Sequence, residues 1–222
     1  MSRKIIVLAG EAGVGKDTFA KPLITAGFNH GSFAANLKQM CQTVFNISPY
    51  LTDTQEGKMK RLEVPRPLRE VQLRAIIRWI DKTHDLTGCA HIISEIKANH
   101  IHKLVRTTGK PKEFHTAREI LQFVGTDICR RICPDYHVDV LAMKIEKMPG
   151  NWVITDARFP NERAMLKKAF GATLIRLKRP GFEPIGGIHE SELSFGKDEE
   201  YDVVFNNSGT IEDLQNEARR YL

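Results

Sequence analysis

The sequence lacks the features that would place the chain in a membrane or in an oxidising compartment. Its longest apolar run near the start, residues 5–9, has five residues, whereas a membrane-spanning helix needs roughly 20. No small-residue cleavage site follows that run, so a secretory signal peptide is not indicated. None of the cysteines, Cys41, Cys89, Cys129 and Cys133, belongs to a C-x-x-C pair, which argues against a zinc knuckle or a redox motif. We therefore predict reduced, structural cysteines in a cytoplasmic protein with no membrane partner.

Repeats, low-complexity tracts and an extreme charge balance are also missing. The chain has 222 residues, enough for one full-sized domain and too few for two ordinary ones. Hydrophobic residues make up 41% and charged residues 27%, which is a globular composition rather than a disordered one. The formal net charge is +6. Such a surplus suits an anionic partner such as a phosphate, a nucleotide or a nucleic acid, and does not choose among them.

The N-terminal part has the pattern of a buried strand, a glycine-rich turn and a helix. Residues 3–9 are mostly β-branched and apolar, which is typical of a strand buried on both faces. Helical patterns follow over residues 16–26 and 35–45. Residues 48–67 are polar and contain three prolines. We predict that this stretch is a mobile connection.

The middle of the chain is predicted to be helical throughout. One helix is indicated by an apolar stripe of Leu73, Ile76, Ile77 and Ile80, and a weaker one covers residues 91–105. The pattern breaks over residues 107–114. Thr116 and Glu119 then have the spacing of a capping box, which opens a helix with the stripe Ile120, Leu121, Val124 and Ile128. One more helix is predicted after Pro134.

The last third alternates strands with helices. Strands are predicted over residues 151–155, 172–177 and 201–205, and helices over residues 160–170 and from the Thr210 cap onward. This alternation predicts an α/β fold with a parallel sheet covered on both faces. We expect a single domain over residues 1–222, with a core of about 1–47 and 115–222 and a helical insertion of about 48–114.

The most specific motif is Gly10-Glu11-Ala12-Gly13-Val14-Gly15-Lys16-Asp17-Thr18. A phosphate site needs several converging backbone amides, which glycines permit without Cβ clashes. It also needs a helix N-terminus and a lysine that neutralises the phosphates. All three parts are present between a buried strand and a helix, so phosphate binding is favoured over a glycine-rich turn that binds nothing. The strict motif has Ser or Thr directly after the lysine, whereas this chain has Asp17 and then Thr18, so direct coordination of a metal by Thr18 is not assured.

Two further groups of polar residues accompany this loop. Asp156 ends an apolar strand, which is where phosphate-binding α/β folds place the carboxylate that orients Mg²⁺; the alternative is an aspartate that caps the next turn. Arg158 follows, and a guanidinium can bind two phosphate oxygens at once. A polar stripe on the capping-box helix could read a base edge and a sugar, although such stripes are more often solvated faces. Its members are Arg118, Gln122, Thr126 and Asp127.

Five motifs together resemble a known family. They are Gly13-Val14-Gly15-Lys16-Asp17-Thr18, the block Arg118 to Gln122 with Val124-Gly125-Thr126-Asp127, Asp156-Ala157-Arg158, Gly171-Ala172-Thr173 with Arg179-Pro180-Gly181, and Asn206-Asn207-Ser208-Gly209-Thr210. In this order they resemble the phage-type deoxynucleoside monophosphate kinases over nearly the whole chain, least over residues 52–114. One departure is Tyr136-His137, where the family carries a tryptophan after a tyrosine, so a stacking role is not implied there.

The resemblance implies a P-loop kinase fold with a five-stranded parallel sheet. It also implies ATP-dependent phosphorylation of a deoxynucleoside monophosphate to the diphosphate with Mg²⁺, in the host cytoplasm if the chain is viral. Lys16, Asp156, Arg158 and Arg130 would serve the transfer. Donor binding would fall to Gly13, Val14, Gly15, Lys16, Asp17, Thr18, Arg179, Asn207, Gly209 and Thr210, and acceptor binding to Arg69, Arg118, Gln122, Thr126, Asp127 and Arg131. Asp17 and Thr18 would hold the metal through water.

Several alternatives stay open at this point. One is a small-metabolite kinase of the dephospho-coenzyme A kinase type, which shares the phosphate loop. Another is a nucleotide-dependent nucleic-acid-binding protein, although no helix-turn-helix or aromatic stacking sheet supports stable nucleic-acid binding. An inactive scaffold is disfavoured by the intact Lys16. A lid is expected because water would otherwise take the γ-phosphate, either over residues 52–69 or over residues 179–194. The accepted bases, the discrimination against ribose and the formation of a homodimer are left open.

Overall fold

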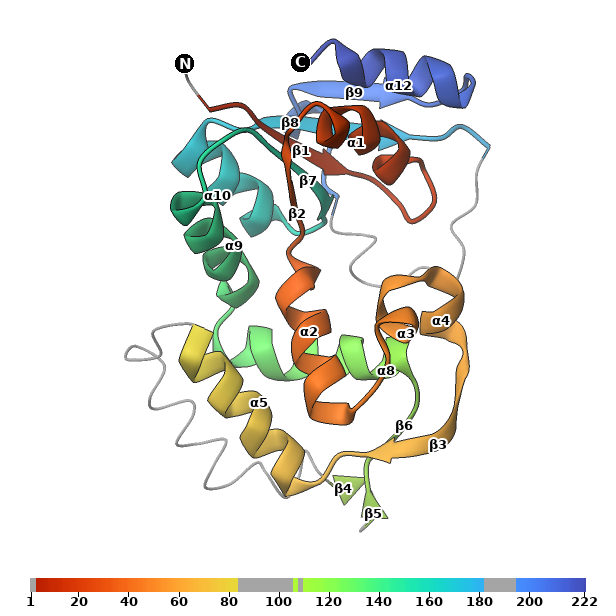
Figure 1. Ribbon diagram of the computed structural model, residues 1–222, viewed down its shortest axis with the longest axis vertical. Helices are drawn as coiled ribbons and strands as arrows, with labels where there is room; N and C mark the ends of the chain where they lie inside the picture. The colour runs from red at the N-terminus through yellow and green to blue at the C-terminus, as the bar shows by residue number, and fades with distance from the viewer. Residues whose placement is uncertain (1–2, 84–105, 108–109, 182–194) are drawn as a thin grey trace. The chain divides into compact units, whose positions relative to one another are not determined.

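The computed structural model describes residues 3–83, 106–107, 110–181 and 195–222 (Figure 1). The chain forms two compact units, and each is described by itself. The first unit comprises Met1–Phe33 and Leu141–Leu222, and the second comprises Ala34–Val140. The expected insertion of residues 48–114 lies within the second unit. That residues 1–222 form a single domain stays a prediction.

A five-stranded parallel sheet forms the centre of the first unit (Figure 1). Every neighbouring pair of strands is parallel. The order across the sheet is β2 (Asn29–Gly31), β7 (Trp152–Ala157), β1 (Ile5–Ala9), β8 (Thr173–Lys178) and β9 (Val203–Asn206). The predicted α/β class and the five-stranded parallel sheet are therefore confirmed.

The central strand β1 is buried along all five of its residues. Ile6 lies opposite Val153 of β7 and Thr173 of β8, so β1 is hydrogen-bonded on both edges. Its alternate residues Ile6 and Leu8 belong to a hydrophobic cluster on one face of the sheet. Burial on both faces explains why this strand has a continuous apolar run rather than an alternating one.

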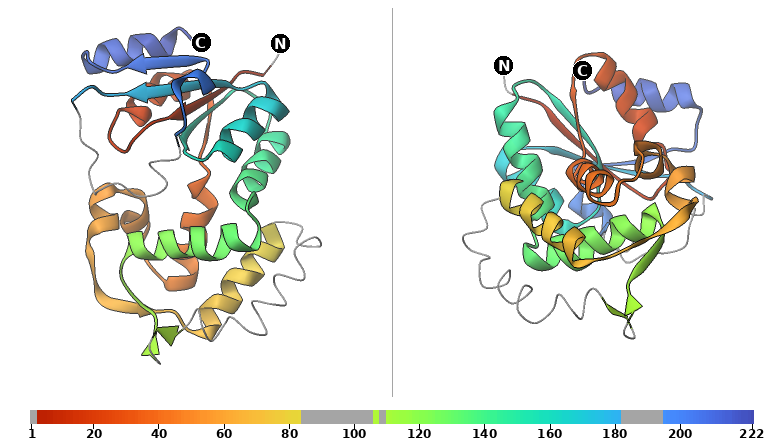
Figure 2. Two further views of the ribbon diagram at one scale, coloured as in Figure 1. Left: turned by 180° about the vertical axis from the view of Figure 1, so that it is seen from behind. Right: turned by 60° about the horizontal axis from the view of Figure 1, so that its bottom comes forward.

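Helices cover the sheet of the first unit. Helix α1 (Lys16–Thr25) and helix α12 (Ile211–Arg219) lie side by side (Figure 2), and the rings of Phe19 and Tyr221 are 6.0 Å apart. Helix α10 (Pro160–Phe170) contacts β1 and β8 from the other side. A short 3₁₀ helix (Asp198–Glu200) precedes β9, and helix α9 (Tyr136–Lys147) extends over the boundary between the units.

Most predicted elements of the first unit are confirmed within about two residues, but β2 was missed. Its sequence, Asn29-His30-Gly31, contains no apolar run, so the pattern gave no strand signal. The strand exists because it pairs with β7. Gly31 is needed there, since a Cβ at this position would lie 2.9 Å from the Cγ1 of Ile154.

The second unit is built mainly from helices around its own hydrophobic core. Its longer helices are α2 (Ala34–Phe45) and α5 (Glu70–Thr83). Helix α8 (Ala117–Gln122) runs directly into a π-helix (Phe123–Arg130). The predicted stripes of α5 and α8 point into this core, which includes Leu73, Ile76, Ile80, Ile120, Val124 and Ile128.

The prediction of a mobile connection over residues 48–67 was wrong, as was the prediction of an all-helical middle. This stretch forms helix α3 (Pro49–Asp53), helix α4 (Gln55–Met59) and strand β3 (Arg61–Pro67). Strand β3 pairs antiparallel with β6 (Glu113–Thr116), and β4 (Arg106–Thr107) pairs with β5 (Lys110–Pro111). The polar composition of this stretch did not indicate the local hydrogen bonds that order it. Thr54, for example, caps α4 by accepting a hydrogen bond from the Gly57 amide at 2.9 Å. The helix predicted over residues 91–105 lies outside the described residues.

The predicted helix after Thr116 is present, but its second half is wider than an α-helix. Thr116 Oγ1 accepts from the Glu119 amide at 3.2 Å, as a cap should. The Glu119 carboxylate accepts from the His115 amide at 2.8 Å, one residue earlier than expected. From Phe123 onward the chain forms a π-helix, which has more residues per turn than an α-helix. A Cβ on Gly125 would lie 2.8 Å from Leu37 Cδ2, so glycine permits the close approach of α2 here.

Candidate functional site

The glycine-rich loop after β1 has the backbone conformation that the motif predicts. Gly10, Gly13 and Gly15 have φ values of 143°, 90° and 103°, a region that side-chain-bearing residues rarely adopt. A Cβ on Gly10 would lie 2.3 Å from the Leu177 carbonyl oxygen, and one on Gly15 would lie 2.8 Å from Leu214 Cδ2. Helix α1 begins directly after Gly15, so its positive end faces the loop. Loop and helix together offer the backbone donors of an anion site.

Lys16 supplies a cation at this loop. Its Nζ donates to the carbonyl oxygens of Gly10 at 2.8 Å and Glu11 at 2.7 Å. The pKa of Lys16 is lowered to about 8, chiefly by burial and secondly by the positive charge of Arg158, against the opposing charges of Asp17, Asp156 and Glu11. A nearby anion stabilises the charged form of a lysine whose pKa is lowered, so a phosphate would favour the protonated state of Lys16.

Asp156 lies near the carboxyl end of β7 and contacts the segment that follows β2. Its carboxylate accepts from Ser32 Oγ at 2.7 Å and from the Phe33 amide at 2.9 Å. Both donors belong to the segment that follows β2, the strand paired with β7. The carboxylate is half-buried beside the loop after β1.

Two buried charged residues hold the backbone of Arg158. The Glu162 carboxylate accepts from the amides of Arg158 at 2.7 Å and Phe159 at 3.0 Å. Arg163 Nη1 donates to the Arg158 carbonyl oxygen at 2.8 Å. Both Glu162 and Arg163 are only 2% exposed. The sequence interpretation missed them, although an acid three residues after the N-cap of a helix is a recognisable capping signal.

Arg163 also anchors the segment before β9. Its Nη2 lies 2.9 Å from the Glu200 carboxylate, and its guanidinium lies 5.2 Å from the centre of the Tyr201 ring. Tyr201 donates its hydroxyl to the Phe195 carbonyl oxygen at 2.6 Å. Arg176, on β8, pairs with Asp198 at 2.9 Å. It therefore serves this structural cluster.

The loop between β9 and α12 contains three of the predicted donor-binding residues. Asn207 Nδ2 donates to the Val14 carbonyl oxygen at 2.9 Å. Thr210 is the N-cap of α12: its Oγ1 accepts from the Asp213 amide at 3.2 Å, and its own amide donates to the Asp213 carboxylate at 2.9 Å. A Cβ on Gly209 would lie 2.7 Å from an Asp213 carboxylate oxygen. Arg179 is exposed just after β8.

The parallel sheet brings these groups to one edge. The loop with Lys16 follows β1, Asp156 and Arg158 end β7, Arg179 follows β8 and Asn207 follows β9. The carboxyl ends of parallel strands are the usual place for a ligand in an open α/β sheet. Asp17 is exposed and Thr18 is half-buried in the first turn of α1. Within residues 3–83, 106–107, 110–181 and 195–222, no three His, Cys, Asp or Glu side chains gather as metal ligands.

The predicted acceptor residues lie in the second unit. Arg118 is half-buried on α8, and its Nη1 is 3.9 Å from Met59 Sδ. Gln122 is half-buried at the end of α8, whereas Thr126 and Asp127 are exposed on the π-helix. The π-helix rotates Thr126 and Asp127 away from the positions that a continuous α-helix predicts. The remaining residues are Arg69, exposed before α5; Arg130, whose Nη1 donates to the Pro134 carbonyl oxygen at 3.4 Å; and Arg131, exposed.

His137, at the position where a stacking role was not implied, is buried. Its Nε2 lies 3.4 Å from the Gly125 carbonyl oxygen, and its ring is 5.2 Å from that of Tyr136. Burial raises the pKa of Tyr136 to about 12, and its hydroxyl lies 2.6 Å from Asn36 Nδ2. These side chains stabilise the second unit rather than face solvent.

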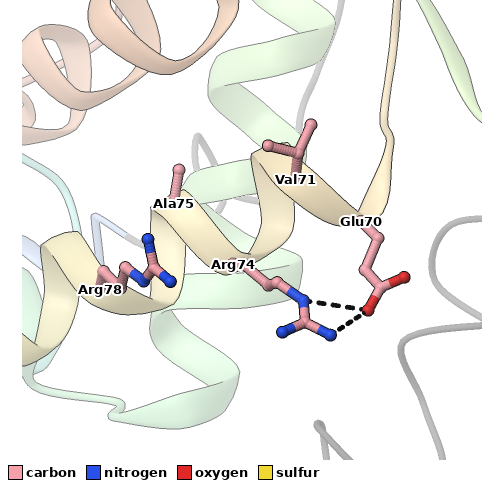
Figure 3. A pocket seen from close by; sticks show the side chains of 5 residues that line it. All are labelled: Glu70, Val71, Arg74, Ala75 and Arg78. Atoms are coloured by element: carbon pink, nitrogen blue, oxygen red, sulfur yellow. Dashed lines mark hydrogen bonds and ion pairs between the residues drawn. The ribbon is translucent and has the colours of Figure 1, made fainter.

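A hollow of about 460 Å³ lies on the surface of α5. Among the described residues it is lined by Glu70, Val71, Arg74, Ala75 and Arg78 (Figure 3). Arg74 and Glu70 form an exposed ion pair at 2.5 Å across one helical turn. None of the predicted site residues lines this hollow.

None of the helices in the described part of the chain combines the length and the apolar character that a bilayer crossing requires.

Two solved kinase structures are similar to this chain at low sequence identity. Dephospho-CoA kinase from Campylobacter jejuni matches with a TM-score of 0.45 and 12% identity, covering 99% of this chain and 95% of that protein. A sugar kinase from Janibacter sp. HTCC2649 matches with a TM-score of 0.39 and 13% identity, covering 100% of this chain and 94% of that protein. Scores of this size do not by themselves relate the functions of the proteins.

Comparisons of sequence are more informative. A protein of Acanthamoeba polyphaga mimivirus that is named as a deoxynucleotide monophosphate kinase is 29% identical over 225 residues, which cover 95% of this chain and 91% of the viral protein. The deoxynucleoside-5'-monophosphate kinase of Escherichia phage T5 is 29% identical over 181 residues, which cover 74% of this chain and 72% of the phage protein. The family model described as deoxynucleotide monophosphate kinase matches residues 4–218. The chain therefore belongs to the deoxynucleotide monophosphate kinase family and is a nucleotide kinase.

Proposed function

We propose that this kinase transfers the γ-phosphate of ATP directly, by in-line displacement, to a deoxynucleoside monophosphate and releases the diphosphate. The observation that carries the proposal is the glycine loop with Lys16 at the same sheet edge as Asp156 and Arg158. Phosphoryl transfer asks a protein for positioning, charge neutralisation and exclusion of water rather than for covalent chemistry. Both named relatives are viral, and the role we propose is supply of DNA precursors in the host cytoplasm.

On the donor side, the loop amides and the Lys16 ammonium would bind the ATP phosphates. The residues assigned to this task are Gly13, Val14, Gly15, Lys16, Asp17 and Thr18. Arg179 and the loop of Asn207, Gly209 and Thr210 would border the rest of the donor. Mg²⁺ suits this site because Asp17, Thr18 and Asp156 offer only oxygen ligands, which this hard cation prefers along with retained waters. When bound, Mg²⁺ would neutralise charge on the phosphates.

On the acceptor side, Arg158 would bind the monophosphate, and the residues of the second unit would bind the nucleoside. Those assigned are Arg69, Arg118, Gln122, Thr126, Asp127 and Arg131, with Arg130 serving the transfer. The acceptor nucleophile is a phosphate oxygen that is already ionised at neutral pH. A general base is therefore not required, and the arginines act by neutralising charge.

ATP binding is expected to weaken as the pH rises through about 8. Burial, reinforced by Arg158, lowers the pKa of Lys16 to about 8, so the ligand-free protein loses this positive charge near that pH. A bound phosphate favours the protonated lysine. Affinity should then fall up to about tenfold per pH unit until the pKa of the bound state is passed.

Calorimetric titration of ATP with Mg²⁺ between about pH 7.5 and 10 measures this decline. Lys16→Ala is the matched control, because its affinity should be weak and nearly independent of pH over that range. A wild-type affinity that stays constant across pH 8 would contradict the assignment of Lys16 to the phosphates.

A coupled assay of ATP consumption tests the whole proposal. We expect turnover with one or more deoxynucleoside monophosphates in a panel that also contains ribonucleoside monophosphates, dephospho-coenzyme A and no acceptor, and we expect loss of turnover when EDTA removes Mg²⁺. Turnover of dephospho-coenzyme A alone would replace the proposal by a small-metabolite kinase. ATP hydrolysis that DNA stimulates, with DNA affinity falling steeply as salt rises, would favour a nucleic-acid-binding function. The same panel of acceptors also identifies the accepted bases. The formation of a homodimer is a separate prediction that this assay does not test.

A further inference from the structure

We propose that the side chain of Asn207 is a positioning residue for the phosphate loop, holding the peptide between Val14 and Gly15 in the orientation that binds an anion. The inference rests on the proposed use of that loop for ATP phosphates, and it assigns Asn207 a role apart from bordering the base. Its site of action is the backbone of a segment 193 positions earlier in the chain.

Hydrogen bonds hold both the side chain and the backbone of Asn207. Asn207 Nδ2 donates to the Val14 carbonyl oxygen at 2.9 Å. The amide of Asn207 itself donates to the Lys178 carbonyl oxygen at 2.7 Å, at the end of β8. Because the backbone of Asn207 is tied to the sheet, its side chain can hold the loop at a fixed place relative to the strands.

The orientation of one peptide decides where its amide points. In a trans peptide the C=O and N–H groups point in opposite directions. The Val14 carbonyl points to Asn207, so the Gly15 N–H points away from Asn207. A loop of this kind binds phosphate through backbone amides that face the anion. The hydrogen bond from Asn207 therefore resists the peptide flip that would turn a carbonyl oxygen toward the phosphate.

Packing on Gly15 reinforces this arrangement. A Cβ on Gly15 would lie 2.9 Å from Asn207 Nδ2 and 2.8 Å from Leu214 Cδ2. Leu214 is buried in the same cluster as Val14 and Phe19. The loop is thus supported from one side by an amide and by a leucine, and it can move only away from them.

The chemistry of the contact calls for an amide at this position. The partner is a carbonyl oxygen, so position 207 must supply a donor. Aspartate has the same shape but only accepts when ionised, and its negative charge would also oppose ATP. Asn206, the preceding residue, is exposed at the end of β9 and serves as a matched control for charge and composition.

The test compares ATP with inorganic tripolyphosphate, which has phosphates and no base. Affinities are measured by calorimetry with Mg²⁺ for wild type, Asn207→Ala, Asn207→Asp and Asn206→Asp. Both ligands should bind Asn207→Ala about tenfold more weakly, by the same factor, since one hydrogen bond and the order it gives the loop are lost. Asn207→Asp should lose more, and Asn206→Asp should change both affinities less than about twofold. In assays, Asn207→Ala should raise the KM for ATP and leave the KM for the acceptor unchanged.

Each other outcome overturns the proposal in a recognisable way. Weaker ATP binding with unchanged tripolyphosphate binding would place Asn207 at the base instead of at the loop. Unchanged binding of both ligands would remove it from the site. A wild-type protein that binds neither ligand would sink the proposed function itself and this inference with it. Melting temperatures show whether the variants fold. Asn207→Ser keeps a shorter donor, so its affinity for tripolyphosphate should lie between those of wild type and Asn207→Ala.

Discussion

Lys16→Ala is expected to abolish phosphoryl transfer, with a fall of about three orders of magnitude or more in kcat/KM. The ammonium is the cation that the glycine loop carries at its end, and in the proposed function it would neutralise charge on the donor phosphates as they react. In the ligand-free protein it donates to two loop carbonyl oxygens, those of Gly10 and Glu11. No other residue of the motif supplies a positive charge.

The same substitution is expected to leave the fold intact. The two hydrogen bonds of Lys16 have a charged donor and are worth about 1.5 to 3 kcal/mol each in net terms, and relief of a poorly solvated charge offsets part of that loss. Melting curves should therefore still show a cooperative unfolding transition. Lys21→Ala, on the exposed side of α1, is the control and should keep full activity. Normal turnover in Lys16→Ala would refute the assignment of this loop to phosphate.

Arg158→Ala is expected to lower the acceptor-dependent rate by about two orders of magnitude or more. Its guanidinium is close enough to contribute to the lowered pKa of Lys16, so it would lie within electrostatic reach of phosphates bound as we propose. Its backbone is held on both sides, by Glu162 at the amide and by Arg163 at the carbonyl oxygen. A guanidinium on a fixed backbone can bind two oxygens of one phosphate, which lysine cannot match.

Two comparisons separate this effect from a general loss of charge. Lys168→Ala removes an exposed cation from the end of α10 and should change the rate little. Arg158→Lys should recover only part of the activity. Arg158→Ala should also move the pH at which ATP affinity declines upward, because one cause of the lowered pKa of Lys16 is gone. A rate equal to that of wild type would remove Arg158 from the site.

The elements that local pattern determines could be predicted from the sequence. The run from β1 through the glycine loop into α1 is one such segment, because buried strand, positive φ and helix start each depend on residues that are adjacent in the chain. The caps at Thr116 and Thr210 are of the same kind, since their partners are three residues away. The prediction of phosphate binding rests on the same kind of contiguous segment.

The elements that depend on distant partners could not be predicted. Strand β2 has no apolar residue and exists through its pairing with β7. Strand β3 contains two prolines and is stabilised by β6, about fifty residues away. Within the π-helix, Gly125 packs closely against Leu37 of α2, a helix distant in the sequence. In each case the deciding contact lies outside any window in which periodicity can be counted.

The residues of the candidate site also differ in whether local sequence could identify them. Lys16 and the glycines were predicted from a contiguous motif, and Glu162 could have been found from its capping position, whereas Arg163 was missed because its role appears only in three dimensions. Arg163 binds Glu200, which lies 37 positions further along the chain. A buried arginine in an amphipathic helix looks like a solvated residue until its partner is known.

Arg163 contacts two stretches of chain that are far apart in the sequence. One guanidinium holds the peptide of Arg158 and also fastens Glu200 and Tyr201, where the chain returns toward β9. Loosening that returning stretch therefore removes a restraint from Arg158, the arginine that we propose binds phosphate. Substitutions at Glu200 and at Arg158 should in consequence fail to add when combined, so the rate of the reaction responds to residues that never meet a nucleotide.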